Sequence, residues 1–286
     1  MAQADPEPGN AQLDSIFRHY ELEEVVVTGT RTPKFLKDTP IQTRVITSRD
    51  IARTDATNVQ DLLQQELSGV EFSYSMNQRT HLNFAGFGGQ GILFLVDGER
   101  LAGESMDDVD FSRLLMAGVE RIEIVKGASS ALYGSNAAGG VVNIITKNAT
   151  EPWTLNLNAR YAKHNDQRYG GVFALHSKHW SNAFSANYHN KDNYNVTSAA
   201  NPVTRVISTI YGERTVDFKD KLTWRPSDRL SLGARAGYFF RETTRTVNVP
   251  ERYRDFSGGL RLDWLISKDD DLQASYAFDQ YDKSDY

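Results

Sequence analysis

Residues 72–81 bring together side chains that can ligate a metal. Tyr74 supplies a phenol, Met76 a thioether and His81 an imidazole, which are three of the axial ligands that haem proteins use. Arg79 lies between them, and its guanidinium suits a carboxylate such as a porphyrin propionate. The stretch therefore offers ligands for a metal complex, with His81 as the candidate axial ligand, whereas a lone histidine beside a strand is more often a surface or core residue.

Catalytic chemistry has no comparable support in the sequence. Ser129, Ser130 and Asp97 have no histidine at a spacing that would activate a nucleophile. The glycines of residues 86–91 precede an apolar strand, whereas a dinucleotide-binding fingerprint follows a strand and opens a helix. We therefore predict that the protein is not an enzyme and that it holds no resident cofactor.

Composition limits the class of protein further. The 286 residues are 40% hydrophobic, which is enough for about two domains with cores of their own. The net charge of −5 gives no basic patch for nucleic acid, and the absence of cysteine excludes disulfides and thiolate metal sites. No run of about 18 apolar residues could form a spanning helix. Residues 1–22 are poor in apolar groups and predict a flexible leader.

Two apolar strands joined by Gly, Ala and Ser form the most distinctive motif of the chain. Residues 119–134 read VERIEIVKGASSALYG, and residues 139–147 read GGVVNIITK. Small residues let the backbone turn tightly between the strands, and the alternation places Glu120, Arg121 and Glu123 on a polar face. Upstream, residues 59–67 predict a helix that begins at Thr57 or Asn58, and residues 92–96 predict a buried strand.

Taken together, these motifs resemble the plug domain of TonB-dependent outer-membrane receptors over residues 23–147. The resemblance implies an α+β plug at residues 32–150 and active transport in place of catalysis. It also makes four side chains candidates for the plug–barrel interface: Glu120, Arg121, Glu123 and Lys126. The chain departs from the family pattern at Lys126 and Ala85, where arginine is usual, and at Ala128, where proline is common.

Residues 23–31 form a β-branched run that resembles a TonB box, the segment that such receptors offer to TonB in the periplasm. An extended β-branched strand is suited to adding onto the edge of a partner's sheet. The candidate contacts with the periplasmic C-terminal domain of TonB are Glu24, Val25, Val26, Val27 and Thr28. The alternative is a first strand that simply packs within the plug.

After Lys147 the chain changes to segments of about ten residues in which apolar and polar side chains alternate. This pattern predicts roughly seven antiparallel transmembrane strands over residues 151–286, with long outer loops near residues 193–213 and 241–251. Polar side chains on one strand face argue against a soluble sandwich. Aromatic residues near the strand ends are candidates for interfacial girdles in outer-membrane lipid: Trp153, Trp180, Tyr188, Trp224, Phe239 and Trp264.

Seven strands fall short of the roughly 22 that a plugged transporter barrel contains, so we expect the N-terminal, truncated part of such a barrel. The resemblance implies that residues 72–81 form an apical loop, where His81, Tyr74, Met76 and Arg79 would contact the cargo. We expect uptake of an iron complex, with haem favoured, delivered free or by a haem-carrying protein. A siderophore or cobalamin is the alternative cargo. A different class also stays open, namely a truncated soluble plug that binds a ligand or partner without transport.

Overall fold

The structure is a computed structural model of the 286-residue chain. It describes residues 25–26, 28, 34–35, 43–54, 56, 58–74, 80–84, 86–88, 91–100, 111, 114, 116, 118–127, 133, 137–198, 201–246, 249–267 and 270–285. Two of the site residues predicted above, Met76 and Arg79, and two of the TonB-box residues, Glu24 and Val27, lie outside the described residues.

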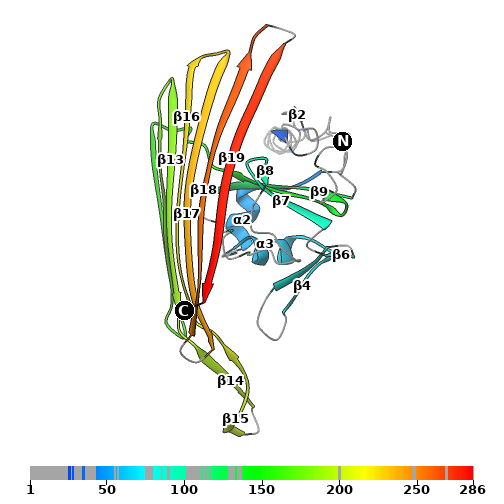
Figure 1. The fold of residues 1–286 in the computed structure, drawn as a ribbon, viewed down its shortest axis with the longest axis vertical. Helices are drawn as coiled ribbons and strands as arrows, with labels where there is room; N and C mark the ends of the chain where they lie inside the picture. Colours follow the sequence, from blue (N-terminus) through cyan, green and yellow to red (C-terminus); the bar gives the residue numbers. More distant parts are fainter. Residues whose placement is uncertain are drawn as a thin grey trace, which may run out of the picture.

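The chain forms an α+β part, the plug, and a tall curved sheet, the wall (Figure 1). The plug region contains β1 (Val25–Val26), β2 (Lys34–Phe35), β3 (Thr43–Ile46), α2 (Ser48–Thr54), α3 (Val59–Glu66), β4 (Val70–Tyr74), β5 (Thr80–Phe84), β6 (Phe87–Gly88), β7 (Ile92–Val96), β8 (Glu99–Arg100), β9 (Val119–Lys126) and β10 (Gly140–Thr146). The wall region contains β11 (Trp153–Ala162), β12 (Asp166–His176), β13 (Trp180–Lys191), β14 (Tyr194–Ser198), β15 (Asn201–Ile210), β16 (Glu213–Ser227), β17 (Leu230–Thr246), β18 (Val249–Leu265) and β19 (Asp271–Asp285).

The plug is built on a five-stranded mixed sheet in the order β3-β9-β10-β7-β8. Strand β10 runs antiparallel to β9 and parallel to β7, so the two strands of the distinctive motif pair directly. Apolar side chains from both strands and from α3 form the core, including Phe94, Ile122, Ile124 and Leu62. The same core holds α3 against the sheet, because an eight-residue helix is not stable alone.

The two plug helices differ in how well the sequence predicts them. Helix α3 begins where expected, with the Asn58 side chain accepting a hydrogen bond from the Asp61 amide at 2.8 Å. Helix α2 is missing from the sequence prediction, although Thr47 and Asp50 form the reciprocal cap that announces it. Among the residues that the structure describes, no helix is long and apolar enough to cross a bilayer.

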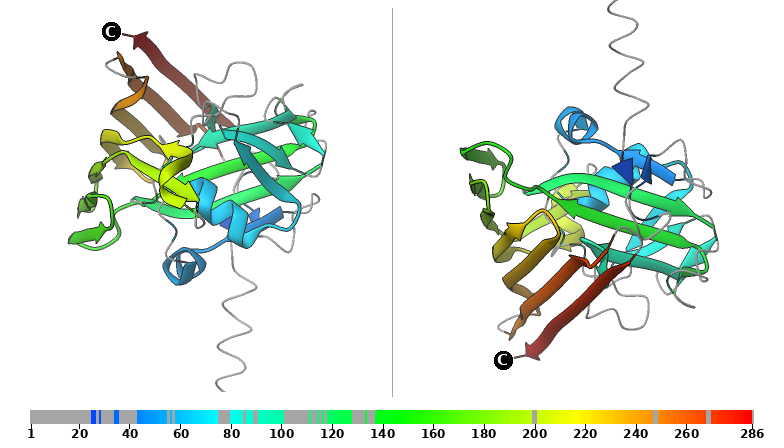
Figure 2. Two further views of the ribbon diagram at one scale, coloured as in Figure 1. Left: turned by 90° about the horizontal axis from the view of Figure 1, so that it is seen from below. Right: turned by 90° about the horizontal axis from the view of Figure 1, so that it is seen from above.

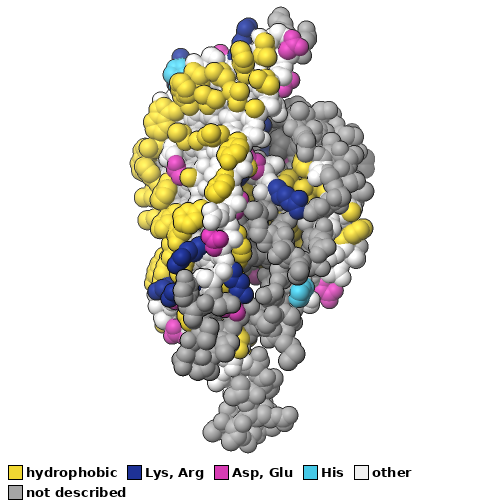
Figure 3. Space-filling view, viewed as in Figure 1, with side chains coloured by type: hydrophobic (Ala, Val, Ile, Leu, Met, Phe, Trp, Pro, Cys, Tyr) yellow, Lys and Arg dark blue, Asp and Glu magenta, His cyan; other side chains and the backbone are white. Residues whose placement is uncertain are grey.

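The wall confirms the prediction of seven antiparallel strands. Its order is β11-β12-β13-β16-β17-β18-β19, with every neighbour consecutive once the β14–β15 hairpin is set aside. The pairing register lines up the apolar side chains of adjacent strands on one face, as in Trp180 opposite Trp224. Figure 3 shows these hydrophobic side chains spread over the outer surface of the wall.

On the exposed face of the wall, the spacing between two rows of aromatic residues matches the thickness of the apolar band of an outer-membrane barrel. The four tryptophans Trp153, Trp180, Trp224 and Trp264 are exposed near the strand ends that meet the short turns. Exposed tyrosines follow eight residues later on two strands, at Tyr161 and Tyr188. Eight strand residues span about 26 Å before tilt is considered, close to the apolar band of an outer-membrane barrel.

Two details of the predicted wall are wrong. Phe239 is not a girdle residue, because it lies on the opposite face and is buried. Residues 241–251 do not form a long loop, because β17 and β18 stay paired as far as Thr246 opposite Val249. The loop prediction failed because the charged and threonine-rich sequence there is polar on both faces, which is typical of a loop but equally of a strand outside lipid.

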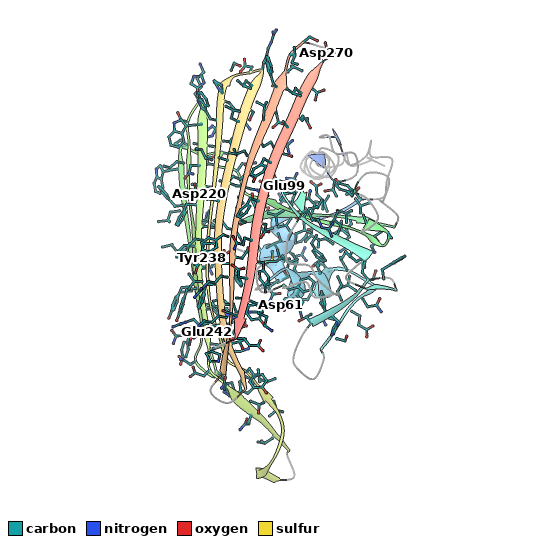
Figure 4. All side chains as sticks on the ribbon, viewed as in Figure 1. Asp61, Glu99, Asp220, Tyr238, Glu242 and Asp270 are labelled. Atoms are coloured by element: carbon teal, nitrogen blue, oxygen red, sulfur yellow. The ribbon has the colours of Figure 1, made fainter. Side chains whose placement is uncertain are left out.

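The wall curves along one side of the plug (Figure 2). Its polar face is turned toward the plug, because Lys221 and Arg235 on that face pair with plug carboxylates. Wall residues on this face are buried where the plug covers them, among them Val172, Ser185 and Asp217. The β14–β15 hairpin projects from one end of the wall, and the turn that carries Asp270 lies at the other (Figures 1 and 4). The two ends of the molecule are therefore distinct.

Placing a charge on the exposed face tests its assignment to lipid. We expect Leu157→Arg, at the centre of β11 and 77% exposed, to weaken insertion into lipid vesicles by about 2–4 kcal/mol, because an arginine near the bilayer centre is costly. The matched control is Asn156→Arg, one residue away on the opposite face. Equal vesicle-bound fractions for the two variants would contradict the assignment.

Candidate functional site

Thr28, the last of the candidate TonB contacts in the TonB-box-like segment, is fixed inside the plug. Its side chain is 0% exposed. Its amide and its hydroxyl both donate to Oε2 of Glu123, at 2.8 Å and 2.6 Å. The amide of Asn143 donates to the Thr28 hydroxyl oxygen at 2.9 Å, and the Tyr133 hydroxyl donates to the Thr28 carbonyl at 2.9 Å. We call Thr28, Glu123 and Tyr133 the anchor.

Glu123 is the charged centre of the anchor and is itself 0% exposed. Its second carboxylate oxygen, Oε1, accepts hydrogen bonds from Arg121, at 3.0 Å from Nε and 2.9 Å from Nη2. Arg121 also pairs with Glu120 at 2.8 Å. A buried carboxylate is tolerated only when it is paired and hydrogen-bonded. Both oxygens of Glu123 meet that condition, one through Arg121 and the other through Thr28.

The rest of the TonB-box-like segment is described only in part. Val25 and Val26 form β1, which pairs antiparallel with Lys34 and Phe35 of β2. The chain therefore reverses direction between β1 and β2, and Thr28 meets the plug sheet between them. Thr28 was predicted as an exposed contact for TonB, but in this conformation it is buried and inaccessible.

The plug meets the wall through a different set of carboxylates, which we call the seam. The Nζ atom of Lys221 on β16 lies 3.1 Å from Oδ2 of Asp97 and donates to the Thr146 hydroxyl at 2.9 Å. Thr146 in turn donates to Asp97 through its amide at 2.9 Å and its hydroxyl at 2.6 Å. Arg235 on β17 pairs with Glu99, which Figure 4 shows between plug and wall.

Among the described contacts, the seam contains none of the residues predicted for the plug–barrel interface, which stay a prediction. Glu120, Arg121 and Glu123 form an ion-pair chain with one another inside the plug. Lys126 is exposed and lies over the Phe84 ring, 5.7 Å from its centroid. The prediction was based on charged residues along one strand face. The seam is instead formed by Asp97 in the Asp97-Gly98 turn and by Glu99 beside it. Acidic residues at a two-residue turn were the signal that could have found it.

The seam is partly shielded from water. Burial raises the pKa of Glu99 above its ordinary value, and the positive charge of Arg235 opposes only part of that effect. A cavity of about 130 Å³ lies beside the ion pairs, lined by seam residues and by apolar side chains such as Leu114 and Phe239. Its size admits a few water molecules. The seam is therefore a polar contact in a confined space.

His81, the candidate axial ligand, lies on β5 opposite Ser73 of β4, and its side chain is half-buried. Tyr74 ends β4, one pair further along the hairpin. The β4–β5 hairpin is nearer to the β14–β15 end of the molecule than to the Asp270 turn (Figure 1). This is the end where an apical loop was expected, but the cargo contacts of His81, Tyr74, Met76 and Arg79 stay predictions.

Two of the described wall histidines, His189 and His164, contact other wall side chains. His189 lies between two carboxylates, 3.0 Å from Asp166 and 3.3 Å from Glu213, so both of its ring nitrogens are used. His164 stacks on Tyr194 with ring centroids 3.8 Å apart. Within the described ranges, no group of three or more His, Asp or Glu side chains is placed to hold a metal ion.

Comparison with known proteins agrees with this architecture. Residues 36–141 match the family model of the TonB-dependent Receptor Plug Domain. The vitamin B12 transporter BtuB of Vibrio cholerae serotype O1 is 40% identical over 127 residues, which are 44% of this chain and 21% of the transporter. The vitamin B12 transporter BtuB of Photobacterium profundum is 34% identical over 123 residues, 43% of this chain and 20% of that protein. The matches thus span about a fifth of the curated relatives.

Solved structures extend the likeness to the wall. The outer-membrane alcaligin receptor FauA of Bordetella pertussis matches 94% of this chain and 44% of its own, with a TM-score of 0.76 at 16% identity. The copper transporter OprC matches 83% of this chain and 36% of its own, with a TM-score of 0.69 at 15% identity. At such identities the likeness is one of fold. The chain therefore carries the plug domain of the TonB-dependent outer-membrane receptor family, joined to seven antiparallel strands with the fold of a receptor barrel.

Proposed function

We propose that the chain acts as the plug and first barrel strands of an outer-membrane receptor that imports a metal complex with energy supplied through TonB. The observation that carries the proposal is the seam, because it holds the plug domain against the polar face of a wall whose other face suits lipid. A soluble plug that binds a partner without transport would have no use for an exposed apolar wall.

The two ends of the molecule suit opposite partners. Strand β2 lies toward the Asp270 end of the wall, whereas the β4–β5 and β14–β15 hairpins lie toward the other end (Figure 1). Short turns mark the periplasmic side of outer-membrane barrels, and longer excursions mark the outer side. This orientation supports a periplasmic position for the TonB-box-like segment, with Val25 and Val26, and a cargo-facing position for His81.

For the cargo we propose a corrinoid such as vitamin B12. Support comes from the plug, where the most similar curated relatives reported above are vitamin B12 transporters. Haem, which the sequence favoured through His81, stays a prediction with no comparison behind it. The structural neighbours are described as receptors for ferric enterobactin, alcaligin and copper, so they favour neither cargo.

Cargo binding separates these alternatives. We expect the 286-residue chain in detergent to retain radiolabelled cyanocobalamin in equilibrium dialysis, and haemin or ferric enterobactin in excess to compete poorly. The control is His81→Ala, which should leave corrinoid binding within about twofold, because the cobalt of cyanocobalamin already has both axial ligands and does not need the imidazole. Saturable haemin binding that His81→Ala abolishes would instead return haem as the cargo.

Transport requires that the plug leave the seam, so the seam should be strong but separable. We expect Arg235→Met to speed amide hydrogen exchange of residues 95–100, by an amount equivalent to about 2 kcal/mol, because Glu99 is left charged and largely buried. Adding Glu99→Gln should recover part of the loss. The control is Arg214→Met, which removes a half-exposed pair with Glu242 on the wall and should cost less than about 0.5 kcal/mol. Equal effects of the two arginine substitutions would contradict the seam.

A further inference from the structure

Asn143 connects the anchor to the seam through a single side chain. It lies on β10, opposite Glu123 of β9 on one side and Leu95 of β7 on the other. Its side chain is 1% exposed. Its Oδ1 atom accepts a hydrogen bond from the Gly98 amide at 3.0 Å, and its Nδ2 atom donates to the Thr28 hydroxyl oxygen at 2.9 Å.

The orientation of this amide is fixed by its neighbours. The backbone N–H of Gly98 can only donate, so it needs the carbonyl oxygen of Asn143. The Thr28 hydroxyl gives its proton to Glu123 at 2.6 Å, so toward Asn143 it can only accept. A flipped amide would break both hydrogen bonds at once. The orientation of the Asn143 amide therefore depends on Thr28 and Gly98 together.

The two contacts of Asn143 belong to different parts of the molecule. Thr28 belongs to the N-terminal segment, whereas Gly98 separates the two seam carboxylates Asp97 and Glu99. Asp97 and Gly98 have φ angles of 52° and 84°, the two left-handed residues of a tight turn. Asn143 holds that turn from the plug side, while Lys221 and Arg235 hold it from the wall.

We propose that Asn143 is a positioning residue that couples the anchor to the seam, so that withdrawal of Thr28 weakens the hold of the plug on the wall. Loss of Thr28 takes the acceptor from Nδ2 of the buried Asn143 amide. Reorientation of that amide toward a new acceptor then removes its oxygen from Gly98. The Asp97-Gly98 turn then loosens, and its ion pairs with it. The coupling rests on contacts within this chain, whereas a pull on the N-terminal segment as its natural trigger rests on the proposed function.

Hydrogen exchange of the full 286-residue chain in detergent micelles tests the coupling, because the two segments can be followed separately. We expect Thr28→Val, which keeps the shape and removes the hydroxyl, to speed exchange about tenfold at residue 28 and severalfold at residues 95–100. In an Asn143→Ala background, the same substitution should have no further effect on residues 95–100. Thr28→Ser should restore the wild-type rates in both segments.

Coupling is reciprocal, which gives a second and independent arm. Lys221→Met on the wall should speed exchange at Thr28, although the two side chains do not touch. The matched control is Thr54→Val, which removes the hydroxyl that donates to the Ile51 carbonyl at 3.0 Å in helix α2 and should leave both segments unchanged. If Thr28→Val fails to fold, Tyr133→Phe replaces it, since it removes the hydrogen bond to the Thr28 carbonyl and leaves the Thr28 side chain in place.

Several results would overturn the coupling. Faster exchange at residue 28 with no change at residues 95–100 would make the anchor and the seam independent. An effect on residues 95–100 that persists unchanged in the Asn143→Ala background would assign the coupling to another route. Binding of the C-terminal domain of TonB is measured separately on the same variants. Absence of that binding in every variant would refute the proposed partner while leaving the exchange result on Asn143 intact.

Discussion

The two-residue alternation of the wall strands is the constraint on which the rest of the structure depends. Successive side chains of a strand point to opposite faces, so a single register decides both faces at once. One face exposes Leu155, Leu157 and the tryptophans, while the other presents Lys221 and Arg235 to the plug. A slip of one residue would put those cations into lipid and the apolar row against the plug.

The plug presents carboxylates to this polar face of the wall. The buried carboxylate inside the plug, Glu123, is stabilised by a different set of contacts. At the seam, Asp97 and Glu99 face cations across a boundary that must open in a transporter. Within the plug, Glu123 is fully buried and shares its two oxygens between Arg121 and Thr28. Removing Thr28 therefore takes two hydrogen bonds from a buried carboxylate. A terminal segment held by a charge in this way is ordered in place without needing a large apolar contact.

Most of the fold was predictable from strong periodic patterns in the sequence. The helix at Asn58, the strand before Asp97 and the seven wall strands were all predicted, because each shows a cap, a turn or a regular alternation. Helix α2 was missed because its seven residues bury none of their side chains and show no apolar stripe. The strands beyond the lipid, near Thr246, were taken for loop because polar residues occupy both faces there.

The candidate site was harder to predict than the fold. Charges on β9 indicated an interface, but burial turned Glu123 inward to Thr28, a partner 95 positions away in sequence. Such long-range pairing leaves no local signal. The seam was missed for the opposite reason, since Asp97 has a sufficient local explanation as a turn residue and nothing in the sequence shows that its carboxylate also meets Lys221.

The two roles of Asp97, in the turn and in the ion pair with Lys221, limit which residues can replace it. The left-handed backbone there, with φ at 52°, admits glycine, asparagine and aspartate far more readily than other residues. The ammonium group of Lys221 pairs with a carboxylate, which glycine and asparagine lack. Glutamate offers the charge but not the turn. Only aspartate meets both demands. We therefore expect residue 97 to stay aspartate unless Lys221 is substituted as well.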